Sequence, residues 1–236
     1  MPETLPSSTL DFIAQVHRAY AGLMRRAPES EEPNLGGRLL YVGKLDEAGR
    51  AFAVAANIAG AATLAASELP TALRHAQREG SIDFVVNSLD EALRIMKNEI
   101  RKHEPVAVAV SLAPEAIELE MIERGVLPNL LPPSSAAEPT SAYDLFLSQG
   151  AHQIPAASLY TQSLFIWAAP AEYAKNLTGF EALLAHHLPP ADRLNRRWLR
   201  LSPRYLGPAA RRLRSVACDG DTAKALITSL GQPLNS

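Results

Sequence analysis

Residues 38–66, RLLYVGKLDEAGRAFAVAANIAGAATLAA, carry the clearest fold signals of this chain. Residues 38–42 form a short, largely apolar run that ends at Gly43, and an alanine-rich helical stretch begins near Gly49. Residues 64–67 supply a second short apolar run. Apolar runs of this length next to glycine are typical of strands, so the stretch predicts a strand, a turn, a helix and a second strand.

The same alternation continues downstream. Gly80 and Ser88 mark the end of one predicted helix and the start of the next, and Ser88 with Glu91 forms a capping box. The run VAVAVSL is apolar throughout, as expected of a central strand covered on both faces. The predicted helices are residues 71–78, 89–102 and 115–124, and the predicted strands are 106–112 and 127–131. Strands and helices that alternate in this way predict an α/β fold, a Rossmann-like parallel sheet with helices on both faces.

Three regions follow from this pattern. Residues 1–35 carry an amphipathic helix at 9–26 and a polar linker. Residues 36–170 form the predicted Rossmann-like domain, with a further strand at 163–168. Residues 171–236 form a helical, arginine-rich extension packed on that domain, and its predicted helices are 171–187, 208–216 and 222–230.

Composition excludes several classes of protein. Hydrophobic residues make up 47% of the chain and charged residues 20%, which are ordinary values for a globular protein. The longest apolar stretch is mostly alanine, too weakly hydrophobic for a membrane span, and no secretory signal is recognisable. Cys218 is the only cysteine, so no intramolecular disulfide and no cysteine-based zinc site can form. We therefore expect a cytoplasmic protein with no membrane partner and no metal.

Four segments, in the same order, resemble the central domain of urocanate hydratase, the urocanase family. They are residues 38–66, the segment SLDEALRIMKNEIRKHEPVAVAV, the segment EMIERGVLPNLL and the segment EPTSAYDL. The resemblance covers roughly residues 36–145. It implies a Rossmann-like fold that binds NAD, which the family uses as an electrophile to add water to urocanate.

The departures from the family fall in its functional loops. This chain keeps Leu45 and Gly49, but it has charged residues where the family has glycines: Lys44, Asp46, Glu47 and Arg50. A Gly-Asn pair of the family is replaced by Leu112 and Ala113. The family's catalytic cysteine region has no recognisable counterpart in the sequence. The resemblance therefore implies the fold, whereas a complete urocanate hydratase is not expected.

The candidate cofactor-binding residues form a degenerate set: Gly43, Gly49, Glu68, Thr140 and Ser141. Glycines in such a turn let the backbone approach a pyrophosphate at a helix N-terminus. Glu68 follows the second strand, where a dinucleotide fold places the acid that binds the ribose, although an ordinary carboxylate at a helix start explains it equally well. Thr140 and Ser141 either line a cleft or form a local turn. No cofactor is expected, NAD is implied by the resemblance alone, and no catalytic residue is identified.

Eight arginines occur between Arg193 and Arg214 with no carboxylate among them. Because the net charge of the chain is −2, this segment at +8 leaves −10 for the remainder. Such a segment attracts an anionic partner, or it lies on a solvated helix face or at a subunit contact. The overall pI of about 6.3 argues against nucleic acid, so we expect it to pack against the chain's own acidic surface or a second subunit.

Three functions remain open. The first is a ligand-binding or assembly module, with a small-molecule ligand and a homo-oligomer or a partner protein. The second is a lyase related to urocanate hydratase that uses NAD and a partner chain. The third is a binder of anionic partners through the arginine segment.

Overall fold

The computed structural model describes residues 7–133, 141–155, 163–173 and 175–234. Six parallel strands form the main sheet, in the order β3-β4-β2-β1-β5-β6. Their bounds are β1 Leu39–Lys44, β2 Ala62–Ala66, β3 Phe84–Val86, β4 Ala107–Val110, β5 Leu130–Leu131 and β6 His152–Gln153. The chain leaves β1 toward β2 on one side and returns to β5 on the other side. The predicted Rossmann-like parallel sheet is therefore confirmed, with its topological switch point between β1 and β5.

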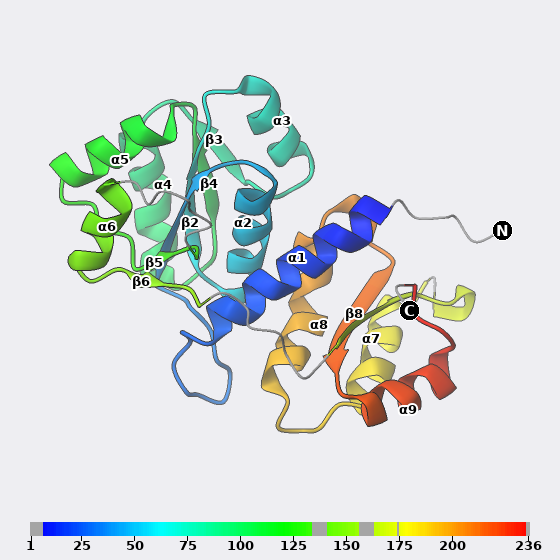
Figure 1. Cartoon of the computed structure of the whole chain (residues 1–236). Coiled ribbons are helices and arrows are strands. Elements are labelled where there is room, and N and C mark those ends of the chain that lie inside the picture. Colours follow the sequence, from blue (N-terminus) through cyan, green and yellow to red (C-terminus); the bar gives the residue numbers. More distant parts are fainter. Residues whose placement is uncertain (1–6, 134–140, 156–162, 174, 235–236) are drawn as a thin grey trace.

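Helices cover both faces of this sheet (Figure 1). Their bounds are α2 Glu47–Ala59, α3 Pro70–Arg78, α4 Leu89–Lys102, α5 Pro114–Glu123 and α6 Ser141–Ser148. The helices α4, α5 and α6 share one apolar core with the sheet, while α2 and α3 pack on the opposite face. Half of the predicted capping box of α4 is present, because Ser88 accepts from the Glu91 N–H, while the Glu91 carboxylate accepts from the N–H of Asn87, the residue before the cap.

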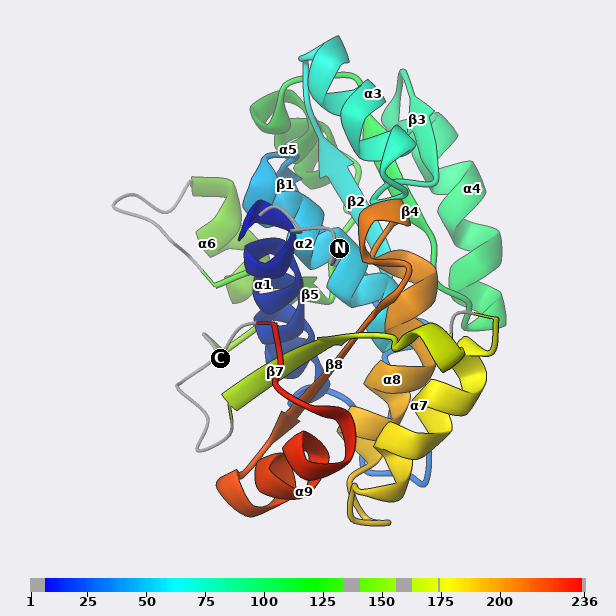
Figure 2. The same cartoon turned by 90° about the vertical axis from the view of Figure 1, so that its right-hand side faces the viewer.

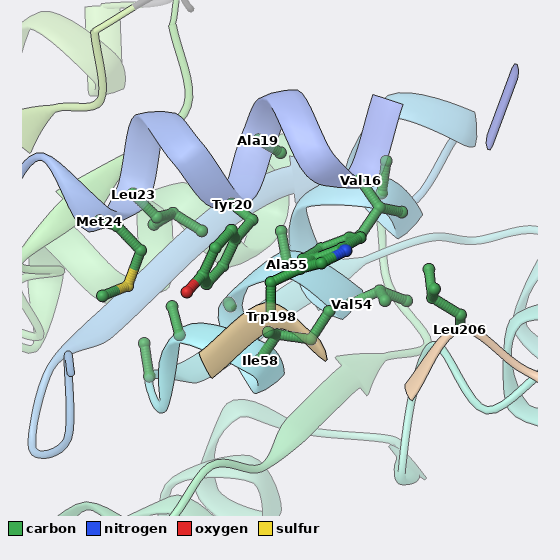
Figure 3. Packing of buried hydrophobic residues seen from close by; sticks show 14 of the residues in the cluster. Val16, Ala19, Tyr20, Leu23, Met24, Val54, Ala55, Ile58, Trp198 and Leu206 are labelled. Atoms are coloured by element: carbon green, nitrogen blue, oxygen red, sulfur yellow. The ribbon is translucent and has the colours of Figure 1, made fainter. Parts of the chain in front are cut away.

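The first helix, α1 Ser7–Met24, packs along α2 and lies between the main sheet and the C-terminal part of the chain (Figures 1 and 2). In Figure 3, Trp198 lies between Val16 and Tyr20 of α1 and Val54 of α2. One apolar core therefore joins the N-terminal helix, the Rossmann-like layer and the C-terminal segment.

The C-terminal part contains a second sheet. Its elements are β7 Ser163–Ala168, η1 Ala171–Tyr173, α7 Leu177–His186, α8 Arg193–Tyr205, η2 Pro208–Ala210, β8 Leu213–Cys218 and α9 Gly220–Leu230. The strands β7 and β8 pair antiparallel, from Ser163 opposite Cys218 to Ala168 opposite Leu213. The strand predicted at residues 163–168 exists, but it pairs with β8 and not with the main sheet. None of the described helices is both long enough and apolar enough to cross a membrane.

Two further segments differ from their predicted secondary structure. The helix predicted at residues 208–216 is a short 3-10 turn followed by β8, all six residues of which are buried. The local turn considered at Ser141 is instead the start of α6, because Ala142 and Phe146 enter the core four residues apart. The strands β3 and β6 and the helix α8 were not predicted.

Candidate functional site

The candidate site lies at the edge of the main sheet where its parallel strands end. In Rossmann-like folds, ligands bind at this edge near the switch point. Gly43 lies at the end of β1, Gly49 in the first turn of α2, Glu68 just beyond β2, and Ser141 at the start of α6. These predicted residues therefore share the same edge of the sheet. Thr140 lies outside the described residues.

Gly43 is a glycine for conformational reasons. Its φ is +68°, in the left-handed region, and the pairing of β1 with β2 shifts register between Tyr41 and Gly43. A Cβ added at Gly43 would meet no heavy atom within 4 Å. The residue thus ends the strand in a conformation that other residues rarely adopt, and the space beside it is open.

Gly49 is a glycine for packing reasons. A Cβ at this position would lie 2.2 Å from the backbone oxygen of Lys44. The first turn of α2 therefore packs directly on the end of β1. Close helix–strand packing is one of the three uses of glycine in a dinucleotide-binding turn, and it requires no ligand.

The chain's own carboxylate occupies the N-terminus of α2. Asp46 is the N-cap, and its Oδ1 accepts from the Gly49 N–H at 3.0 Å. The adjacent Glu47 accepts from Gln15 Nε2 of α1 at 3.1 Å. A helix N-terminus binds a phosphate through free N–H groups and its positive dipole end. Here two carboxylates lie at that end and one N–H is already bonded, so these residues do not fit a pyrophosphate.

The other predicted ligand residues, Glu68 and Ser141, are exposed and line neither of the two cavities described below. Glu68 is exposed, while the neighbouring Ser67 is buried and its hydroxyl accepts from the Leu69 N–H at 3.2 Å. Ser141 is exposed at the first position of α6. The local turn at Ser67 and the helix start at Ser141 account for these positions without a ligand.

A cavity of about 500 Å³ lies between α1 and α2, beside the carboxyl ends of β5 and β6. Its walls are mostly apolar, with Gln15, Arg18 and Glu47 as the polar residues. The complete lining is Gln15, Arg18, Ala19, Glu47, Ala48, Ala51, Phe52, Pro133, Ile154 and Pro155. A cavity with apolar walls and few polar groups suits a small organic ligand. The helix α1 was not predicted as a wall of this site, because its amphipathic pattern does not show which of its residues line a cavity.

Cys218 is placed as a core residue. It is buried in β8, and burial raises the pKa of its thiol to about 11, with further contributions from Asp219 and Asp192. A thiol with such a pKa carries almost no thiolate at neutral pH. Among the described residues, no three histidine, cysteine, aspartate or glutamate side chains gather to hold a metal.

The arginine segment is largely engaged by the chain itself. Four of its arginines donate to backbone oxygens: Arg193 to Ser30, Arg196 to Leu188, Arg197 to Ile58 and Arg212 to Ala169. Among the eight arginines of this segment, only two pair with a described carboxylate: Arg200, at 3.4 Å from Glu32, and the buried Arg214, at 2.6 Å from Glu181. Carbonyl oxygens, more than an acidic surface, are therefore the partners of this segment.

The model of the urocanase Rossmann-like domain matches residues 15–159 of the chain. The match includes the second half of α1 and all six strands of the main sheet, and it ends before β7. It therefore extends beyond residues 36–145 at both ends.

Proposed function

Because the chain belongs to the urocanase Rossmann-like domain family, we propose that it acts as a ligand-binding or assembly module without the complete machinery of urocanate hydratase. The observation that carries this proposal is the Asp46 cap. Its carboxylate bonds the Gly49 N–H at the position where a dinucleotide fold binds pyrophosphate. The inherited turn thus retains its helix and strand, while its phosphate-binding end is negatively charged.

Electrostatics and geometry support the same proposal. A pyrophosphate at the N-terminus of α2 would approach Asp46 and Glu47, both exposed and both negative. It would also have to displace the Asp46 oxygen from the Gly49 N–H, which lies at an ordinary hydrogen-bond distance. Arg50, the nearest cation on the same helix, already pairs with Glu79 at 2.7 Å. Repulsion and an occupied donor therefore both weaken nucleotide binding.

The edge offers apolar surface that suits assembly. Leu69 and Leu112 follow β2 and β4, and their exposed fractions are 55% and 36%. Leu112 stands where the family has a polar glycine-asparagine pair. Exposed leucines at an edge where relatives carry polar ligand residues support contact with a protein surface. We place this module in the cytoplasm, where its single buried cysteine stays reduced.

Titration with NAD tests the proposal directly. We expect the protein to bind NAD with a dissociation constant weaker than about 100 µM, and the variant Asp46→Asn/Glu47→Gln to bind it more tightly. Asparagine caps a helix as well as aspartate does, so this variant removes the charges and keeps the helix start. Calorimetry is the measurement. A dissociation constant of about 1 µM or lower for the unmodified protein would refute the proposal.

The enzyme alternative has its own test. We expect no loss of urocanate absorbance above a heat-treated control when the protein is incubated with urocanate and NAD. Cys218, the chain's only thiol, is buried with a raised pKa, which leaves no described thiol group suited to catalysis. Turnover that depends on added NAD would favour the lyase alternative.

A further inference from the structure

A second cavity, of about 300 Å³, lies where α1, α2 and α3 meet η2. We call it the Arg50 cavity. Its lining is Ser8, Thr9, Phe12, Ile13, Glu47, Arg50, His75, Glu79, Ser81, Tyr205, Leu206, Gly207, Pro208, Ala209 and Ala210. The residues from Tyr205 to Ala210 lie outside the family match, so this cavity combines the Rossmann-like layer with the C-terminal part of the chain.

Arg50 is the central polar group of this cavity. Its side chain is only 18% exposed and lies over the Phe12 ring, 5.9 Å from the ring centre. A guanidinium has five N–H donors. Among the described residues, its only hydrogen-bond acceptor is the Glu79 carboxylate, through Nη1. Its other donors bond to no described residue and are not enclosed, and the side chain lines the cavity, so the planar fork remains available for a carboxylate.

Negative groups adjoin the same cation. Glu79 lies 2.7 Å from Arg50 and 3.3 Å from His75 Nε2, and Glu47 is three residues before Arg50 on the same face of α2. Two carboxylates in the wall disfavour a phosphate dianion, and the guanidinium disfavours a simple cation. A molecule that carries one carboxylate and one ammonium group satisfies both kinds of wall residue.

The size and apolar surface of the cavity narrow the ligand further. A volume of about 300 Å³ is at the lower limit for small-molecule sites and too small for a dinucleotide. Phe12, Ile13 and Leu206 provide apolar surface beside the charged groups. Gly207 allows η2 to close the cavity, since a Cβ there would lie 2.8 Å from the Glu79 backbone oxygen.

We propose that the Arg50 cavity binds a free amino acid, with the carboxylate on Arg50 and the ammonium group between Glu47 and Glu79. This inference names the ligand class of the ligand-binding module proposed above, and it rests on that proposed function. The two can fail separately, because the NAD titration of the unmodified protein does not depend on Arg50, and the variants used below for amino-acid binding leave Asp46 and Glu47 unchanged.

The experiment is calorimetric titration with glycine, leucine, phenylalanine, glutamate and lysine, each at up to about 10 mM. Acetate, ethylammonium and inorganic phosphate are the matched probes that carry one kind of charge. We expect at least one amino acid to bind with a millimolar or lower dissociation constant, and each single-charge probe to bind at least about tenfold more weakly.

Three variants locate the site. Arg50→Lys keeps the charge and removes the fork, and Ala209→Phe fills the cavity without changing its charge, so each should weaken amino-acid binding at least about tenfold. The control is Arg74→Lys, because Arg74 is exposed on α3 outside the cavity and bonds the Pro70 backbone oxygen. Circular dichroism establishes that each variant is folded. The proposal is overturned if no amino acid binds, if phosphate binds more tightly than every amino acid, or if binding survives both cavity variants.

Discussion

The helix α2 packs against two layers of opposite character. On its sheet side, Gly49 and Ala53 approach small residues such as Ala65, so helix and strand backbones lie close together. On its other side, Val54 contacts the large aromatic core around Trp198 (Figure 3). The first layer lies within the family match, whereas Trp198 comes from the segment beyond it. The sheet side of α2 therefore relies on small side chains, whereas its contact with the C-terminal part relies on large ones.

The largest loss of stability is expected in the aromatic layer, the core around Trp198 that α1, α2 and α8 share. Trp198 is fully buried, and its Nε1 donates to Ser215 Oγ at 3.0 Å. Trp198→Ala should lower the free energy of unfolding by about 4 kcal/mol, because it leaves a cavity between α1, α2 and α8 and an unpaired hydroxyl. Urea unfolding followed by circular dichroism measures the loss. Trp198→Phe should lose less, and equal losses for the two variants would contradict a packing role for the ring.

The small-residue layer, where α2 packs on the sheet, should be destabilised by added volume and not by lost volume. Gly49→Ala places a methyl group 2.2 Å from the Lys44 oxygen and should cost about 3 kcal/mol of unfolding free energy. The matched control is Gly220→Ala in the first turn of α9, where an added Cβ meets nothing within 4 Å. That control should change stability by less than about 1 kcal/mol. A Gly49→Ala protein as stable as the control would mean that Gly49 is not needed for packing.

The sequence predicted the small-residue layer better than the aromatic one. The run 38–66 carries strand, turn and helix signals locally, so the Rossmann-like fold followed from it. Whether this turn binds a ligand could not be predicted from the sequence. A glycine required for close packing and a glycine required beside a phosphate look the same in a sequence, because both are needed for their missing Cβ. Gly49 is the first kind, and only the Lys44 contact distinguishes them.

The elements that were wrongly predicted or not predicted share a physical cause. Part of the strand β8 was predicted as a helix, because its partner β7 lies 45 or more residues away and the local sequence does not show that pairing. The helix α8 was not predicted; it contains Pro203 in its last turn, where a proline disrupts little of the helix. Strand pairing and cavity walls depend on contacts that are distant in sequence. The Arg50 cavity is the clearest case, since η2 and α2 lie more than 140 residues apart.

The smallest of the three effects concerns a charge in the aromatic layer. His17 is buried in α1, and its ring meets the Trp198 ring edge to face with centres 4.8 Å apart. Burial, followed by the nearby Arg18, lowers the pKa of His17 to about 4 from an ordinary value of 6.5. Between these two values the unfolded chain binds a proton that the folded chain does not bind. The folded state therefore loses stability as the pH falls below 6.5, and this contribution levels off below about 4.

The expected size of the loss is about 2 kcal/mol between pH 7 and pH 5, since one pKa unit corresponds to about 1.4 kcal/mol. Other groups also titrate in this range, so the test compares the protein with His17→Phe by urea unfolding at pH 7, 6 and 5. The phenyl ring keeps the contact with Trp198 and takes up no proton, so its advantage over histidine should grow as the pH falls. The control is His152→Gln, which removes a histidine at an exposed position in β6. If the difference between the unmodified protein and His17→Phe stayed constant from pH 7 to 5, the aromatic layer would accept a charge, and the contrast between the two layers of α2 would rest on size alone.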